Sequence, residues 1–196
     1  IKEKVIKDKI EEVGSKGIIE DKYLIKNRLI VNSQRGNLLG ELKESLRECK
    51  SFCFSVAFIN FSGLQLLLDS FRDLGERGVK GKIITSTYLN FTEPKALEKV
   101  KSFENIDLNI FIADSEKGFH TKAYIFENED NFKIIIGSSN ITQRALKSNV
   151  EWNVMIISKK DTDFVKEVLE EYEGIWSSTG IVDDEFLEKY NEFIKS

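Results

Sequence analysis

The pattern that most constrains this chain is an alternation of short apolar runs with helix-like segments. Three runs rich in β-branched and aromatic residues, SFCFSVAFI (51–59), VKGKIITST (79–87) and IDLNIFIA (106–113), alternate with helix-like segments at 62–78 and 92–103. Such runs are typical of strands buried on both faces, and their alternation with helices is typical of a parallel sheet. The sequence therefore predicts a βαβαβ core and an α/β fold.

Three further strand-like runs follow with little helix between them: FHTKAYIF (119–126), FKIIIG (132–137) and EWNVMIIS (151–158). They extend the predicted core into a mixed central sheet flanked by helices. Residues 24–32 are either a strand or an extended link. Further helices are expected at 1–13, 36–49, 161–174 and 183–195. We expect one domain over residues 1–196, with the helix at 1–13 and the acidic helices of 161–196 as extensions.

Composition limits the class of protein. The chain has 196 residues, of which 41% are hydrophobic, enough for one core. No apolar run approaches the ~20 residues that cross a bilayer, and the charged opening IKEKVIKDKIEEVG lacks the apolar stretch of a signal peptide. We therefore expect a cytoplasmic protein with no membrane partner. Two cysteines and one histidine also argue against a zinc site.

Charge is distributed unevenly along the chain. Residues 161–196 contain eleven acidic residues and three lysines, whereas the rest of the chain is slightly basic. Nucleic-acid binders need basic surface, because neutralised phosphates supply much of their affinity. The sequence therefore does not indicate a strong general DNA binder, but it allows a locally basic groove.

The only histidine stands close to a lysine in a strand-like run. In FHTKAYIF, alternation places His120 and Lys122 on one face of the predicted strand. A lysine in so apolar a run indicates an anionic partner, since burying an unpaired ammonium is costly. By itself, a lone histidine in a strand is more often structural than catalytic.

A polar turn and a glutamate follow the histidine. The next predicted strand ends in Gly137-Ser138-Ser139-Asn140, which offers hydrogen-bond donors near a predicted helix N-terminus, and Glu151 begins the third strand. Glycine, serine and asparagine are ordinary turn residues, and a glutamate at a strand end can simply be an edge charge. Together, however, the histidine, the lysine, the turn and the glutamate supply a nucleophile, a cation, donors and an orienting carboxylate.

This constellation resembles the H-x-K … G-S-x-N … E signature of the phospholipase D superfamily. The segments FHTKAYIF, IIGSSNITQRAL, VEWNV and ITSTYLNFTEPKAL resemble, more narrowly, the phospholipase D-like nuclease domain at the N-terminus of some bacterial DEAD/DEAH-box helicases. Related domains occur in metal-independent restriction endonucleases. The resemblance covers about residues 18–175 and implies a phospholipase D-like α/β/α sandwich.

The resemblance also implies covalent catalysis with no metal or other cofactor. It implies that His120 is the nucleophile, that Lys122 and Asn140 hold the non-bridging oxygens, and that Glu151 orients the imidazole. Further substrate contacts are expected from Ser138, Ser139, Lys133, Arg144 and Tyr88. Because the chain carries one motif and the chemistry uses two histidines, the resemblance implies a homodimer with one shared site.

DNA is the expected substrate, because of this branch resemblance and a modest basic cluster near the motif. The cluster consists of Lys117, Lys122, Lys133, Arg144 and Lys147. The resemblance also allows a helicase domain on the same longer chain and a place in a restriction or repair system. The alternative is a catalytically silent DNA-binding or dimerisation module of a larger helicase. The acidic tail favours it, and so does Glu127, which stands where the family motif has aspartate. A lipid phosphodiesterase is disfavoured, because no membrane-binding amphipathic segment is evident.

Overall fold

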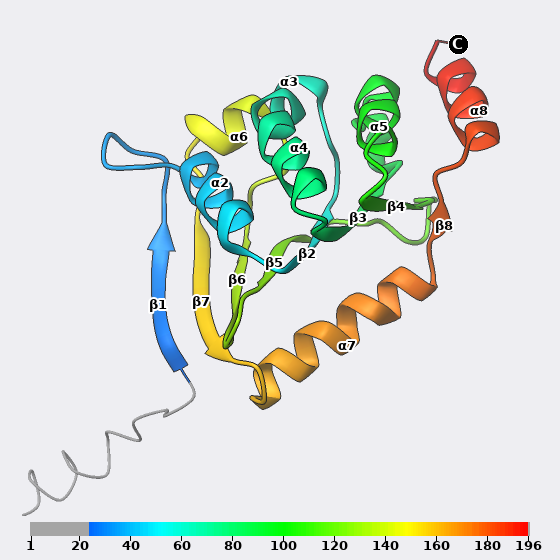
Figure 1. Cartoon of the computed structure of the whole chain (residues 1–196). Helices are drawn as coiled ribbons and strands as arrows, with labels where there is room; N and C mark the ends of the chain where they lie inside the picture. The colour runs from blue at the N-terminus through cyan, green and yellow to red at the C-terminus, as the bar shows by residue number, and fades with distance from the viewer. Residues whose placement is uncertain (1–23, 196) are drawn as a thin grey trace, which may run out of the picture.

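The computed structural model describes residues 24–195, so the helix predicted at 1–13 lies outside the described residues. Within them, one mixed sheet has the strand order β1-β7-β6-β5-β2-β3-β4-β8 (Figure 1). Its strands are β1 (Leu24–Ile30), β2 (Ser51–Val56), β3 (Lys80–Ser86), β4 (Ile106–Phe111), β5 (Lys122–Glu127), β6 (Asn131–Gly137), β7 (Asn153–Lys159) and β8 (Gly180–Ile181). β2, β3 and β4 are parallel neighbours, which confirms the predicted core. β5, β6, β7 and β1 continue the sheet in antiparallel pairs.

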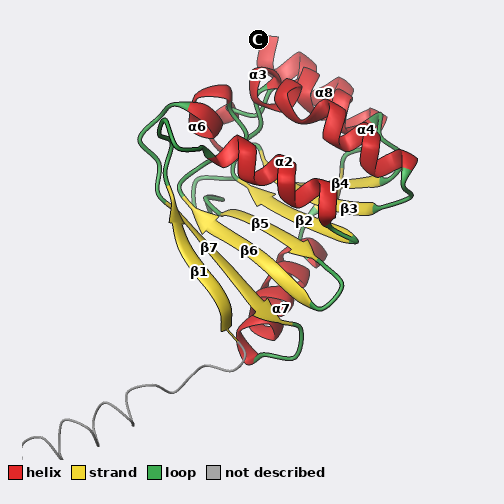
Figure 2. Ribbon diagram, turned by 60° about the vertical axis from the view of Figure 1, so that its left-hand side comes forward, coloured by secondary structure: helices red, strands yellow, loops and turns green. Residues whose placement is uncertain are grey.

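Helices cover both faces of this sheet, as Figure 2 shows. The described helices are α2 (Leu38–Glu48), α3 (Phe61–Leu64), α4 (Leu68–Glu76), α5 (Pro94–Lys101), α6 (Gln143–Lys147), α7 (Asp163–Ser177) and α8 (Asp184–Lys195). A short 3-10 turn, η1 (Gln65–Leu67), divides the helix that was predicted over 62–78. Among the described helices α7 alone lies on one face, which gives the expected α/β/α layers. None of the described helices is long and apolar enough to cross a membrane.

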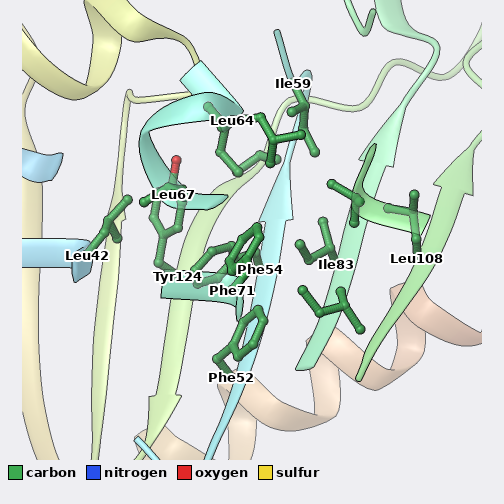
Figure 3. Packing of buried hydrophobic residues seen from close by; sticks show 14 of the residues in the cluster. Leu42, Phe52, Phe54, Ile59, Leu64, Leu67, Phe71, Ile83, Leu108 and Tyr124 are labelled. Atoms are coloured by element: carbon green, nitrogen blue, oxygen red, sulfur yellow. The ribbon is translucent and has the colours of Figure 1, made fainter. Parts of the chain in front are cut away.

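Aromatic rings fill the larger core, between the sheet and the helices that include α2 and α4 (Figure 3). Phe54 of β2 is fully buried, and its ring centroid lies 4.9 Å from those of both Phe52 and Tyr124. Phe71 of α4 closes the cluster, with its ring 5.8 Å from that of Phe52. The apolar run of β2 is therefore buried on this face through its aromatic residues.

The opposite face carries a smaller core and an apolar row that the described helices leave open. α7 packs Val165 and Tyr172 against the middle of the sheet. Leu29, Val154 and Ile136 stand in register across β1, β7 and β6. Their exposed fractions are 49%, 45% and 42%, in the same order. We call these three residues the open row.

Replacing Phe54 by alanine removes a ring from the centre of the aromatic cluster. We expect the free energy of unfolding to fall by about 3–5 kcal/mol, the usual cost of deleting a buried phenylalanine ring. Urea denaturation at an unchanged m-value measures this loss. Ile181→Ala, at a residue that is 75% exposed in β8, is the control and should change stability by less than about 0.5 kcal/mol. Equal effects of the two substitutions would contradict the assignment of Phe54 to the core.

Candidate active site

The register of the strands brings the motif segments to one edge of the sheet. Val56 ends β2 opposite Lys122, which begins β5. Gly137 ends β6 opposite Asn153, which begins β7. The segments just before β5, just after β6 and just before β7 therefore meet. They meet at the carboxyl ends of the parallel strands, where α/β sheets commonly bind ligands.

His120 and Lys122 are in direct contact at this edge. β5 begins at Lys122. The exposed His120 therefore lies just before the strand, whereas the sequence predicted it within the strand. Nζ of Lys122 lies 2.5 Å from Nδ1 of His120 and donates a hydrogen bond to its carbonyl oxygen at 2.9 Å. Burial lowers the pKa of Lys122, and the negative charge of Glu151 opposes this shift. The structure thus holds a partly desolvated cation against the imidazole.

Glu151 is held by Ser138 at the same edge. Oγ of Ser138 donates to Oε2 of Glu151 and accepts from the backbone N–H of Trp152 at 3.2 Å. In this arrangement these contacts take the place of the Glu151–imidazole hydrogen bond that the family signature implies. Glu151 remains close enough for its charge to act on Lys122.

Asn140 is buried and is oriented by the backbone that follows β2. Its Oδ1 accepts a hydrogen bond from the N–H of Phe58 at 3.2 Å. Because Oδ1 accepts this hydrogen bond, the side-chain amide has a fixed orientation. Its two N–H donors are on the other atom, Nδ2. A contact with a phosphate oxygen, which the signature implies for Asn140, requires such a donor.

Gly137 and Ser139 build the turn that carries Asn140. A Cβ on Gly137 would lie 2.3 Å from the carbonyl oxygen of Trp152, so only glycine lets the ends of β6 and β7 approach so closely. Ser139 is fully buried, and its Oγ accepts from Nδ2 of Asn153 at 3.0 Å. Its carbonyl accepts from the hydroxyl of Tyr124 at 2.7 Å. The structure therefore places the Ser139 side chain inside the turn, away from the open edge.

The remaining predicted substrate contacts are placed differently. Tyr88 lies at the site, with its ring centroid 5.6 Å from that of His120 and nearly perpendicular to it. Arg144 is exposed on α6, in the connection between β6 and β7. Lys133 is buried in β6, where Nζ lies 3.2 Å from Oε1 of Glu41 on α2. The structure does not bring Lys133 to the site.

The position that departs from the family motif also lies away from the histidine. Glu127 ends β5, five residues beyond Lys122, which at ~3.3 Å per residue is roughly 16 Å. Its carboxylate accepts hydrogen bonds from Ser51 at 2.8 Å and from Lys160 at 2.7 Å. The bond from Lys160 is the main cause that lowers the pKa of Glu127. This glutamate joins β5 to the start of β2 and to the turn after β7.

Two polar contacts that support the site were missed by sequence reasoning. Asn153 holds Ser139, as described above, and Ser55 of β2 is 2.5 Å from Thr121, the residue after His120, between their hydroxyl oxygens. Ser55 and Asn153 are polar residues inside apolar strand runs. Polar residues are unusual in such runs, so their presence there was the sequence signal that could have identified these two supporting residues.

Neither a metal-ligand cluster nor a reactive thiol lies among residues 24–195. No group of three or more His, Cys, Asp or Glu side chains there is arranged to hold a metal ion. Burial raises the pKa of Cys49 and of Cys53 to about 11, so both thiols are protonated at neutral pH.

Residues 42–176 match the family model described as "Cardiolipin synthase, PLD-like domain". The chain belongs to the phospholipase D superfamily. The matched segment includes all the motif residues from His120 to Glu151, so the resemblance read from the motif is confirmed. A search of curated proteins finds no match.

Three solved structures share this fold. NucT from Helicobacter pylori is 17% identical with a TM-score of 0.61, over 79% of this chain and 97% of that one. Nuc from Salmonella typhimurium, a phospholipase D family member, is 19% identical with a TM-score of 0.60, over 81% and 100%. Phosphatidylserine synthase from Haemophilus influenzae is 15% identical with a TM-score of 0.66, over 86% of this chain but only 44% of that one. At these identities the likeness shows the fold alone.

Glu127→Gln removes a carboxylate whose pKa is lowered in the folded protein. Such a group stabilises the fold above its unfolded-state pKa of about 4.3, and this stabilisation is lost as the pH falls through the lower folded-state pKa. We expect wild type to be more stable than the variant at neutral pH by less than about 1 kcal/mol, because the ion pair is partly exposed. The difference should shrink below about pH 4. Urea denaturation of both proteins from neutral to acid pH checks this, and a difference that does not change with pH would contradict it.

Proposed function

We propose that this chain is a metal-independent phosphodiesterase that cleaves DNA through a phosphohistidine intermediate, at a site shared by two copies. The contact between Nζ of Lys122 and the exposed imidazole of His120 supports this most, because it lies at the open edge of a phospholipase D-like sheet. A cation held against an imidazole attracts a phosphodiester to the place where the nucleophile can reach it.

The proposed reaction has two steps. Nε2 of His120 attacks phosphorus, and the bond from phosphorus to one bridging oxygen breaks. The departing oxygen takes a proton from the imidazolium of His120 in the second copy. Water then attacks phosphorus and gives a proton to the second imidazole, and the phosphorus–nitrogen bond breaks. The products are one phosphate end, one hydroxyl end and the free first imidazole. Lys122 and Asn140 hold the non-bridging oxygens throughout.

The Lys122–His120 contact makes the tautomer of the imidazole depend on substrate binding. While the ammonium donates to Nδ1, a neutral ring carries its proton on Nε2, which then has no lone pair for attack. A phosphate oxygen that draws Nζ away leaves Nδ1 able to hold the proton. Glu151 is the nearby carboxylate that would accept a hydrogen bond from it. His120 is thereby activated when the substrate is bound.

A second copy of the chain is proposed to cover the open row. Ile136, in this row, directly precedes the Gly137 turn, and the exposed Trp152 follows Glu151. Large apolar side chains exposed beside a polar site are typical of interaction surfaces. A copy bound there by a two-fold axis brings a second His120 towards the first.

DNA is proposed as the substrate because exposed cations stand close to the motif segments in the sequence. Lys117 precedes His120, and Arg144 and Lys147 are exposed on α6. A place in a helicase, restriction or repair system, with a helicase domain as partner, rests on the sequence resemblance. A silent DNA-binding or dimerisation module would use the same surfaces and would differ by failing to cleave.

The deciding measurement is the cleavage of labelled DNA in excess EDTA. Wild type should cut, and His120→Ala should lower the rate by roughly a thousandfold or more, because it removes the nucleophile. Glu127→Gln is the matched control and should keep most of the activity, since Glu127 lies at the far end of β5. Denaturing gels of base-quenched reactions should show labelled protein that loses its label in acid, as expected of a phosphohistidine.

Several results would contradict this proposal. Cutting that needs a divalent cation, or cutting by His120→Ala at the wild-type rate, would refute the mechanism. DNA binding without cleavage by either protein would favour the silent module. Turnover of a phosphatidyl lipid with no cleavage of DNA would refute the substrate.

The shared site predicts that assembly and activity are lost together. Ile136→Glu combined with Val154→Glu places two charges in the open row and should convert a dimer into a monomer with little cleavage activity. Ile181→Glu, at the other edge of the sheet, is the control and should change neither. Sedimentation velocity and the EDTA cleavage assay measure the two properties, and a fully active monomer would refute the shared site.

A further inference from the structure

The connection between β3 and α5 forms an apolar rim beside the site. It contains the 3-10 turn η2 (Tyr88–Asn90) and exposes Leu89 and Phe91, which are 60% and 50% accessible. Single exposed apolar side chains are common on protein surfaces, but several that gather in one patch can mark a binding site. We call Tyr88, Leu89 and Phe91 the rim.

The backbone of the rim is firmly anchored at both ends. Ser86 and Thr92 are fully buried, and Oγ1 of Thr92 donates to the carbonyl oxygen of Ser86 at 2.7 Å. Oγ of Ser86 accepts from the N–H of Tyr88 at 3.1 Å, and Thr87 accepts from the N–H of Ala113 at 3.0 Å. The exposed side chains are therefore presented by a fixed backbone.

Two successive residues of the rim have left-handed backbone conformations. Leu89 has φ of 52° and Asn90 has φ of 56°. Asparagine tolerates this region, but a leucine seldom adopts it. Conformations of this kind persist where the surroundings impose them, and they occur often at functional sites.

The rim contacts one motif residue directly and is linked to a second through Phe58. The ring of Tyr88 stands edge-on to the imidazole of His120, at 5.6 Å between centroids. Phe91 packs against Phe58 at 5.4 Å, and the N–H of Phe58 is the donor that orients Asn140. The rim is therefore joined to the proposed nucleophile through Tyr88 and to the proposed phosphate ligand Asn140 through Phe91 and Phe58.

We propose that the rim binds an unpaired base next to the cleaved phosphodiester, so that the chain prefers single-stranded DNA. The inference rests on the proposed function and adds the strand preference of the same site. Phe91 supplies a face on which any base can stack, and Leu89 borders it. A base within a duplex already stacks on both sides and pairs with its partner, so it is not free to lie on Phe91.

Binding tests the rim without depending on cleavage. In the His120→Ala chain, adding Phe91→Ala should weaken the binding of a short single-stranded oligonucleotide by roughly 5- to 150-fold, the range expected for loss of one base–aromatic stack. Binding of a duplex of the same sequence should not change. Phe91→Trp should restore the affinity, and Phe193→Ala, at an exposed ring on α8, should leave it unaltered.

A probe that lacks one base identifies the stacked nucleotide. Removing the base next to the cleaved bond should weaken binding to the chain with Phe91 and should have little further effect on the Phe91→Ala chain, because the two changes remove the same contact. In the active chain, Phe91→Ala should raise KM for single strands with little change in kcat.

Three outcomes would overturn the inference. The first is equal loss of single-strand and duplex affinity, and the second is no loss at all. The third is a change of oligomeric state in Phe91→Ala, which would assign the rim to an interface between copies. Each of these is separable from failure of the proposed function, which would appear as absent cleavage in EDTA by the chain that retains His120.

Discussion

The antiparallel return of β5 beside β2 is the constraint on which the site depends. Parallel strands place their carboxyl ends at one edge, and β5 starts at that edge because it runs in the opposite direction. Had β5 been parallel to β2, the segment with His120 would lie at the far edge, away from the turn after β6. A slip of one residue would turn Lys122 to the other face of the sheet.

The packing of the core fixes this register and reaches the site directly. Phe54 and Tyr124 face each other on β2 and β5 with their rings edge to face, a favourable arrangement for aromatic pairs. The hydroxyl of Tyr124 continues from this cluster to the carbonyl of Ser139, in the turn that holds Asn140. A buried ring thus sets both the pairing of two strands and the position of a polar turn. Packing in the core and geometry at the edge are therefore coupled.

Much of this arrangement could be predicted from the sequence, because it depends on local pattern. The apolar runs of β2, β3 and β4 and the leucines of α2 identify their own elements, and the spacing of the family signature identifies His120 and Lys122. Side-chain partners were less predictable, because they depend on contacts between distant segments. Lys133 looks like a substrate ligand in the sequence, but its partner is Glu41, contributed by α2. Ser139 looks like a donor, but Asn153 and Tyr124 enclose it.

The glutamate at the far end of β5 bears on how relatives of this chain are recognised. Glu127 joins three segments through Ser51 and Lys160, and a side chain one methylene longer than aspartate meets these partners. In this chain the position supplies a carboxylate at the closing end of β5, and its two partners, Ser51 and Lys160, lie away from the imidazole. A search pattern that demands aspartate at this position selects for contacts at the far end of β5, and not for the groups around the imidazole. It would therefore miss this chain, although His120, Lys122, Asn140 and Glu151 are all present in it.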